Sequence, residues 1–168
     1  MRVASLPTPA MSHNRGVDIS AKTDYAIRAL LTIAAEQDRG PVSVESLVTH
    51  QGLPRKFLES ILGDLRRGGL VVSQRGPTGG YTLARPATEI AVAEVFRVVD
   101  GPLAEVRGLR PHETEYAGAA SHLPTLWVAV RASLRSVLDG TTIADLLTGE
   151  LPEHVTLLAA QPDAWKSR

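Results

Sequence analysis

The stretch "FLESILGDLRRGGLVVSQRGPTGGYTLAR", residues 57–85, limits what this chain can fold into more than any other part of it. Its first half places Leu58, Ile61, Leu62 and Leu65 three or four residues apart, which gives a helix one apolar side. A glycine pair then ends that helix. The second half holds two short apolar runs around "RGPTGG", whose glycines supply the positive φ angles of a tight hairpin turn. The stretch therefore predicts an amphipathic helix followed directly by a two-stranded hairpin.

A shorter helix is expected just before this stretch. Ser43 is a suitable N-cap and Glu45 lies in the positive first turn, while Gly52 stands where a left-handed residue closes a helix. Pro54 then opens the longer helix at a position where its missing N–H costs nothing. Two helices joined so closely are typical of a helix-turn-helix, and a hairpin directly after them makes a winged helix. The expected fold is therefore mainly α-helical, with a small β-hairpin as the wing.

The rest of the chain divides by composition and periodicity. In chain order we expect a disordered N-terminal tail (1–18), a winged helix-turn-helix DNA-binding domain (19–102), a loop (103–122), a long helix with a short packing helix (123–148) and a C-terminal tail (149–168). Within the domain, Ser20 or Thr23 is the expected N-cap of the first helix. Thr88 is the expected N-cap of the last helix, which ends at a glycine–proline pair.

The helix expected at 123–138 has an apolar face longer than a single small domain needs, so we expect a partner to cover it. The residues of this face are Leu123, Leu126, Trp127, Val130, Leu134, Val137 and Leu138. For Trp127 a second interpretation stays open, that it lines an effector pocket. We favour core or interface packing, because a tryptophan at helical spacing more often packs there.

The charge pattern favours a nucleic-acid partner although the whole chain has a formal net charge of zero. Between residues 54 and 85 the basic side chains are Arg55, Lys56, Arg66, Arg67, Arg75 and Arg85, and the acidic ones are Glu59 and Asp64. Six basic minus two acidic side chains give this segment a net charge of +4, which attracts the phosphates of a nucleic acid. An ordinary solvated face is the alternative, and for Arg66 and Arg67 alone the two interpretations are about equally good.

A recognition helix reads bases mainly with its N-terminal residues, which here are Arg55, Lys56, Glu59 and Ser60. Arginine donates to guanine O6 and N7, and glutamate accepts from cytosine N4. In the wing, Gln74, Arg75, Gly76, Gly79 and Gly80 are expected at the DNA backbone or minor groove. A glycine backbone approaches closely because no Cβ intervenes.

Several classes of protein are excluded or disfavoured by what the chain lacks. It has no cysteine, which excludes a disulfide, a thiolate nucleophile and a cysteine-held iron–sulfur cluster. No motif of a hydrolase, P-loop or zinc protease is present, so we expect no enzyme and no catalytic residues. No apolar run reaches the roughly 18 residues of a membrane span and no secretory signal is visible, which predicts a cytoplasmic protein.

The loop expected at 103–122 contains residues of the types that bind metal ions. His112, Glu113, Glu115 and His122 are its candidate ligands, but they lack tight spacing, and a solvated loop with two ordinary histidines is the favoured interpretation. We therefore expect no metal and no cofactor.

Three segments together resemble the Rrf2 family of bacterial winged-helix transcription regulators: "KTDYAIRALLTIA", "LPRKFLESILGDLRRGGLVVSQRGPTGGYTLARP" and "EIAVAEVFRVVDGPL". The resemblance covers about residues 19–103 and, more weakly, the long helix after the loop. It implies a homodimer built by the helix at 123–138, a recognition helix starting at 55–60 and a wing at 74–81. The residues it implies at the DNA include Lys22, Thr23, Phe57, Glu59 and Arg67.

The chain departs from the family in one segment. Many members hold an iron–sulfur cluster with three cysteines after the match to "DGPL", where this chain has "AEVRGLRPHETEYAGAASH". The expectation is therefore a cluster-free, sequence-specific DNA-binding regulator. It would act as a homodimeric repressor on a near-palindromic operator, with a small-molecule or protein effector left open. The alternative is an interaction adaptor that keeps the winged-helix shape but no longer binds DNA.

Overall fold

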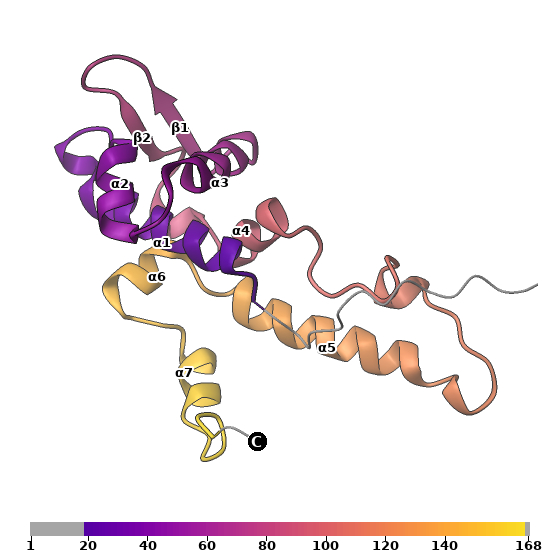
Figure 1. Ribbon diagram of the computed structural model, residues 1–168. Helices are drawn as coiled ribbons and strands as arrows, with labels where there is room; N and C mark the ends of the chain where they lie inside the picture. Colours follow the sequence, from indigo (N-terminus) through magenta and orange to yellow (C-terminus); the bar gives the residue numbers. More distant parts are fainter. Residues whose placement is uncertain (1–18, 167–168) are drawn as a thin grey trace, which may run out of the picture.

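The computed structural model describes residues 19–166, so the N-terminal tail expected at 1–18 lies outside the described residues. A compact winged domain stands at one end of a long helical arm (Figure 1). The elements are α1 (Ala21–Glu36), α2 (Val44–Gln51), α3 (Arg55–Arg67), β1 (Val71–Gln74), β2 (Gly80–Leu83), α4 (Val92–Val99), α5 (Leu123–Leu138), α6 (Ile143–Thr148) and α7 (Glu153–Ala159). The mainly helical fold with a two-stranded hairpin is the one predicted.

The predicted caps and turns of the winged domain are largely confirmed. The Ser20 hydroxyl accepts the Thr23 N–H at 3.0 Å, and the Ser43 hydroxyl accepts the Ser46 N–H at 3.1 Å. Gly52 closes α2 in the left-handed conformation with φ 63°. Pro54 is the residue just before α3, where its ring again displaces no needed donor. These local signals place α2 and α3 three residues apart.

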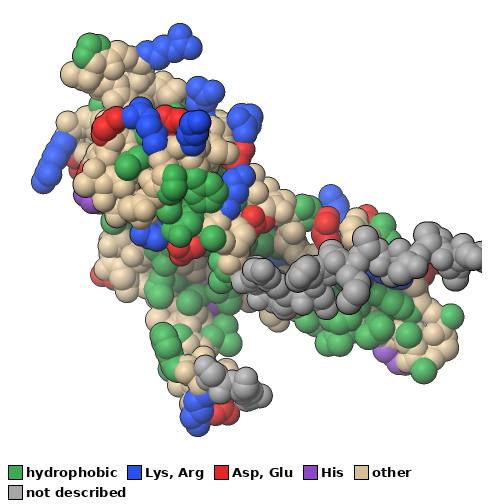
Figure 2. Space-filling view, in the orientation of Figure 1, with side chains coloured by type: hydrophobic (Ala, Val, Ile, Leu, Met, Phe, Trp, Pro, Cys, Tyr) green, Lys and Arg blue, Asp and Glu red, His purple; other side chains and the backbone are tan. Residues whose placement is uncertain are grey.

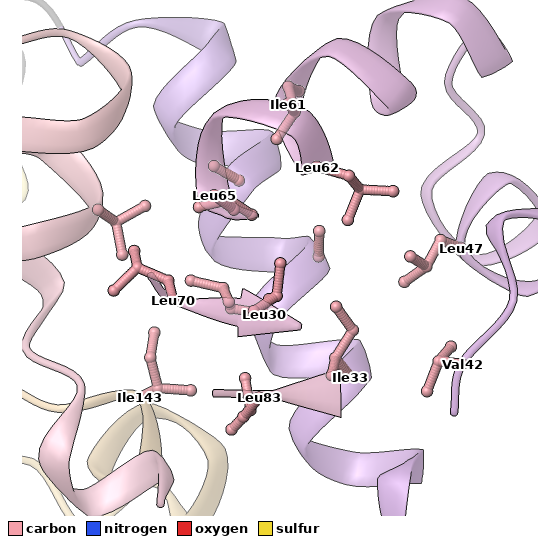
Figure 3. Packing of buried hydrophobic residues seen from close by; sticks show 14 of the residues in the cluster. Leu30, Ile33, Val42, Leu47, Ile61, Leu62, Leu65, Leu70, Leu83 and Ile143 are labelled. Atoms are coloured by element: carbon pink, nitrogen blue, oxygen red, sulfur yellow. The ribbon is translucent and has the colours of Figure 1, made fainter. Parts of the chain in front are cut away.

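The core of the domain is made by apolar side chains from every element of the winged helix. Leu30 and Ile33 of α1 meet Leu62 and Leu65 of α3 and Leu83 of β2, all of them buried (Figure 3). Ile143, from α6, which follows the arm in the chain and packs on α1, is fully buried in the same cluster. The chain therefore returns to the winged domain after α5, so that the segments entering and leaving the arm both belong to the domain (Figure 1).

The hairpin pairs Val71–Gln74 with Gly80–Leu83 in antiparallel register. Val42, ahead of α2, adds a further rung, because its N–H and C=O both bond to Tyr81 at 2.9 and 2.8 Å. A Cβ on Gly80 would come within 2.3 Å of the Val42 carbonyl oxygen. At Gly79 a Cβ would lie 2.3 Å from the Gln74 carbonyl oxygen. These two glycines are therefore required by backbone packing inside the wing.

Two expectations about local structure were wrong. Thr88 does not cap α4, because residues 87–89 form a separate 3₁₀ turn and α4 begins at Val92 after Ala91. The Glu94 carboxylate instead accepts the Ala91 N–H at 3.0 Å and stabilises that helix start. The expected C-terminal tail contains a helix, α7, whose residues are all at least partly exposed.

The arm consists of α5 and the segment that leads to it. No residue of α5 is buried although the helix is rich in valine and leucine. The segment expected as a loop at 103–122 contains two 3₁₀ turns, Pro111–Glu113 and Gly118–Ala120, and the first of them packs on α5 (Figure 1). One side of α5 is thus covered by its own chain.

Candidate nucleic-acid interface

The longer helix of the helix-turn-helix presents two different faces. Leu58, Ile61, Leu62 and Leu65 are fully buried against the domain core. The opposite face is exposed and carries four of the residues predicted to contact bases, Arg55, Lys56, Glu59 and Ser60. Lysine and arginine side chains gather on the part of the surface that belongs to the winged domain (Figure 2). The helix thus shows solvent the polar side chains that a recognition helix needs.

Arg55 is held by two carboxylates. Its Nε donates to Glu59 Oε1 at 2.8 Å, one turn along α3, and its Nη1 makes a short ion pair with Glu45 of α2. Hydrogen bonds to Glu59 and then to Glu45 raise the pKa of Arg55 further. Glu45 was not predicted at this site, because contact between two helices leaves no periodic signal in the sequence. Any DNA contact by Arg55 has to share the guanidinium with these carboxylates.

Asp64 organises a second charged cluster. It accepts Lys22 Nζ of α1 at 2.5 Å and makes a short ion pair with Arg67, one turn further along α3. The hydrogen bond from Lys22 outweighs the effect of burial and lowers the pKa of Asp64. Arg85 is likewise paired, with Glu94. Of the six basic residues counted between 54 and 85, Lys56, Arg66 and Arg75 have no carboxylate partner within residues 19–166.

Two predicted contact residues have roles inside the protein. Thr23 is fully buried and its hydroxyl donates to Asp100 Oδ2 at 2.7 Å, so the expected DNA contact of its side chain is wrong. The same carboxylate accepts the Ser20 hydroxyl at 2.7 Å. Phe57 is 37% exposed, and its ring meets the ring of Tyr25 edge-on with centroids 5.9 Å apart. Phe57 therefore joins α3 to α1 while one edge stays at the surface.

The wing projects from the domain with a polar tip. Gln74, Arg75 and Gly76 are exposed, and Gly76 has φ 115°, a conformation that strains any residue with a Cβ. Gly79 and Gly80 are half-buried and serve the hairpin itself. The structure thus leaves Gln74, Arg75 and the neighbouring backbone exposed at the tip of the wing.

An apolar groove of about 770 Å³ runs along α5, beside the end of α4. Five of the seven residues predicted for a dimer interface line it: Leu126, Val130, Leu134, Val137 and Leu138. Leu123 and Trp127 do not, and the indole N–H of Trp127 is buried without an acceptor within residues 19–166. Apolar side chains gather over much of the arm in Figure 2. Exposed apolar area of this kind is typical of a surface that another chain covers.

The residues present do not fit a thiolate-held iron–sulfur cluster. All 168 residues lack cysteine, and the segment after "DGPL" offers histidine, carboxylate and tyrosine side chains but no thiolate. Within residues 19–166 no three histidine or acidic side chains come close enough to hold a metal ion together. His112, one of the candidates, instead meets Arg131, whose guanidinium donates to Nδ1 at 3.3 Å.

No helix among residues 19–166 combines the length and the apolar character needed to cross a bilayer.

Known proteins share both the sequence and the fold. The Rrf2 family, described as iron-dependent transcriptional regulators, matches residues 19–149. An HTH-type transcriptional regulator of Mycobacterium tuberculosis is 48% identical over 141 residues, which are 84% of this chain and 88% of that protein. CymR of Bacillus subtilis, an HTH-type transcriptional regulator, is 33% identical over 128 residues, which are 76% of this chain and 88% of CymR.

Solved structures agree with these relatives. The structure of CymR, described as the global cysteine regulator of B. subtilis, has a TM-score of 0.68 at 31% identity and covers 80% of this chain and 98% of its own. The IscR of T. potens has a TM-score of 0.63 at 30% identity and covers 91% of this chain and 94% of its own. With its helix-turn-helix, its wing and a match over most of its length, the chain belongs to the Rrf2 family of transcriptional regulators.

Proposed function

We propose that this protein is a cluster-free homodimeric regulator that binds a near-palindromic operator and represses by occupying it. The observation that carries the proposal is the set of cations without carboxylate partners, Lys56, Arg66 and Arg75, on the recognition helix and the wing. Cations without a partner gain most from phosphates, because binding does not cost them an existing ion pair. The absence of cysteine supports regulation without a thiolate-held cluster.

The dimer is proposed from the arm. The apolar groove along α5 fits a second copy of the same helix, since a two-fold interface needs one self-complementary patch. Two winged domains held in this way would address half-sites about one helical turn, or a multiple of it, apart. In this proposal residues 19–102 bind DNA, 103–122 connect and 123–148 dimerise.

The test is selection of bound sequences from a random DNA pool, repeated at two salt concentrations. We expect an enriched palindrome for the natural protein. Arg75→Ala should weaken binding to all sequences and lower the salt slope by about 1, since one phosphate contact is lost. Arg67→Ala is the matched control, because that guanidinium already forms an ion pair with Asp64, and its salt slope should change less.

An adaptor that does not bind DNA is the second candidate. It is favoured by the pairing of Arg55 with Glu45 and Glu59, which lowers the positive charge at the start of the recognition helix. Absence of binding at low salt would support the adaptor. Binding without enrichment of any sequence would leave a non-specific DNA-binding protein and contradict the operator.

A further inference from the structure

A second crevice lies in the arm, between the end of α4, the segment that follows it and α5. It has a volume of about 820 Å³. Its lining residues are Arg97, Pro102, Leu103, Ala104, Arg110, Arg131, Arg135 and Asp139. Four guanidinium groups and one carboxylate give it a net charge of four minus one, or +3. The chain as a whole is neutral, so this is a concentration of positive charge away from the candidate DNA-binding surface.

The single carboxylate is already used. Asp139 accepts Arg97 Nη2 at 2.5 Å and Arg135 Nε at 3.0 Å. Burial acts to raise the pKa of Asp139, but hydrogen bonds from Arg97 and Arg135 outweigh it and lower that pKa. The group therefore stays ionised at neutral pH and shares one charge between two arginines. One of the four positive charges is thereby balanced.

The other two arginines are not balanced. Neither Arg110 nor Arg131 has a carboxylate partner within residues 19–166. The guanidinium of Arg131 donates to His112 Nδ1 at 3.3 Å, which leaves most of its donors unused. Guanidinium groups lining one concave site suit oxyanions, because each presents parallel N–H donors to two oxygens of a phosphate or carboxylate.

The crevice stays open in the proposed dimer. Arg131 and Arg135 are the α5 residues that line it, and neither lines the apolar groove. The two sites therefore use different sides of α5, so that a second copy seated on the groove would not fill the crevice. They share one wall, the segment 102–104, in which Ala104 has an unusual positive φ of 57°.

We propose that this crevice binds a small organic polyanion, a molecule carrying two or more phosphoryl or carboxylate groups, as the effector of the regulator. A volume of about 820 Å³ lies in the range of small-molecule sites, roughly 300–1,000 Å³, and exceeds what an inorganic anion fills. The effector role rests on the proposed function, whereas the binding site does not.

The crevice borders two parts of the molecule on which a bound effector would act, the proposed dimer groove and α4. The shared wall at 102–104 borders the proposed dimer groove, so a ligand that moves it changes that surface. Arg97 belongs to α4, and α4 packs against the recognition helix α3. The contact is close at the end of α3, where Val98 of α4 leaves no room for a side chain on Gly68. A ligand that draws Arg97 away from Asp139 would therefore act on α4 and through it on α3.

The test is titration calorimetry of the full chain with pyrophosphate and with citrate, at constant ionic strength. Natural protein should show saturable binding of at least one probe. Arg131→Gln and Arg110→Gln should each weaken it by about tenfold or more, the loss expected for one charged hydrogen-bonding group. Tighter binding of pyrophosphate assigns a phosphoryl ligand, and tighter binding of citrate assigns a carboxylate ligand.

Two controls place the site. Arg107 lies in the segment between α4 and α5 but does not line the crevice, because its guanidinium lies over the Tyr116 ring, 5.2 Å from the ring centroid. Arg107→Gln should therefore leave binding of the probe unchanged. Arg75→Ala on the wing should also leave it unchanged, which separates this site from the DNA surface. Circular dichroism and light scattering confirm that each variant is folded and keeps its oligomeric state.

Several outcomes would overturn the inference. The first is that neither probe binds saturably, and the second is that Arg107→Gln weakens binding as much as Arg131→Gln does. The third is that Arg131→Gln dissociates the dimer, which would show that the arginines pair with a second copy instead. DNA selection separates this result from the proposed function. Probe binding without DNA binding contradicts the regulator and keeps the site, and DNA binding without probe binding contradicts the site alone.

Discussion

Thr23 shows how one side chain can look like a ligand contact and serve the fold instead. Its hydroxyl is buried and donates to Asp100, 77 residues away, at the end of α4. Together with Ser20, it fixes the start of α1 against the end of α4. A hydrogen bond to an ionised acceptor inside a domain contributes about 1.5–3 kcal/mol.

Thr23→Val keeps the shape of the side chain and removes this donor. We expect the free energy of unfolding in urea to fall by about 1–3 kcal/mol, because one hydrogen bond to Asp100 is lost. DNA affinity at temperatures where the variant is folded should be unchanged. Thr49→Val is a control, since that exposed hydroxyl bonds only to the Glu45 carbonyl in its own helix. A loss of DNA affinity without a loss of stability would restore Thr23 to the interface.

Asp64 links stability to pH. The pKa of its carboxyl is lower in the folded protein than the ordinary value of about 3.9, chiefly through Lys22. Its contribution to stability is therefore complete above about pH 4 and is lost as pH falls through the folded pKa. Asp64→Asn should lower stability at pH 7, and its difference from the natural protein should shrink below about pH 4.

Urea unfolding at pH 7, 5 and 3 measures this dependence. Asp38→Asn is the control, since that exposed carboxylate has no ion-pair partner within residues 19–166 and should show no such pH-dependent difference. A difference between Asp64→Asn and the natural protein that stays constant down to pH 3 would contradict the role of the Lys22 contact.

At the scale of elements, the wing depends on a close approach of three backbone segments. β2 pairs with β1 on one side and with Val42 on the other, and Gly80 sits where a Cβ would strike the Val42 carbonyl. The wing is thus anchored to the segment before α2. Its position relative to the recognition helix depends on this rung as well as on the turn at its tip.

Gly80→Ala should destabilise the domain by about 1–3 kcal/mol, the usual cost of forcing an extra carbon into packed surroundings. Thermal unfolding measures the loss, and hydrogen exchange should show the Tyr81 N–H, which bonds to Val42, losing protection first. Gly63→Ala is the matched control in α3, because its Cβ would meet only the mobile end of Arg67 and alanine favours helix. If Gly80→Ala left the stability unchanged, the pairing between Val42 and Tyr81 would add no stability.

At the scale of the whole molecule, the arm gathers its apolar side chains on one side. The groove along α5 collects residues from α4, α5 and α7, including Phe96, Val130 and Leu158. The other side of α5 carries Arg131 and Arg135, which line the crevice. A single chain therefore carries three distinct surfaces: the candidate DNA-binding surface, the groove proposed for a second copy and the crevice proposed for an anion.

Val130→Asp places a charge in the groove and should yield monomers, since an unpaired charge at a dimer core is strongly unfavourable. Light scattering measures the mass, and DNA affinity should fall because two half-sites are no longer engaged together. Val128→Asp is the matched control on the same helix, since Val128 is exposed and does not line the groove. If Val130→Asp remained a dimer, the dimer interface would not lie at this groove.

The sequence by itself determined the order and type of the elements in the winged domain. Apolar spacing at Leu58, Ile61, Leu62 and Leu65 and the glycine at 52 act within a few residues, so they can be seen without the fold. The same reasoning missed α7 and placed the α4 cap at Thr88, because a short helix and a carboxylate cap leave weak local signals.

The tertiary structure alone decided which charges are free. Lys22 meets Asp64 across 42 positions and Arg55 meets Glu45 from another helix, so that three of the six basic residues between 54 and 85 are paired with carboxylates and three are not, within the described part of the chain. The crevice joins Arg97, Arg110 and Arg131 from three separate segments. Charge pairing depends on distances of a few ångströms between residues far apart in the chain, and local periodicity carries no information about those distances.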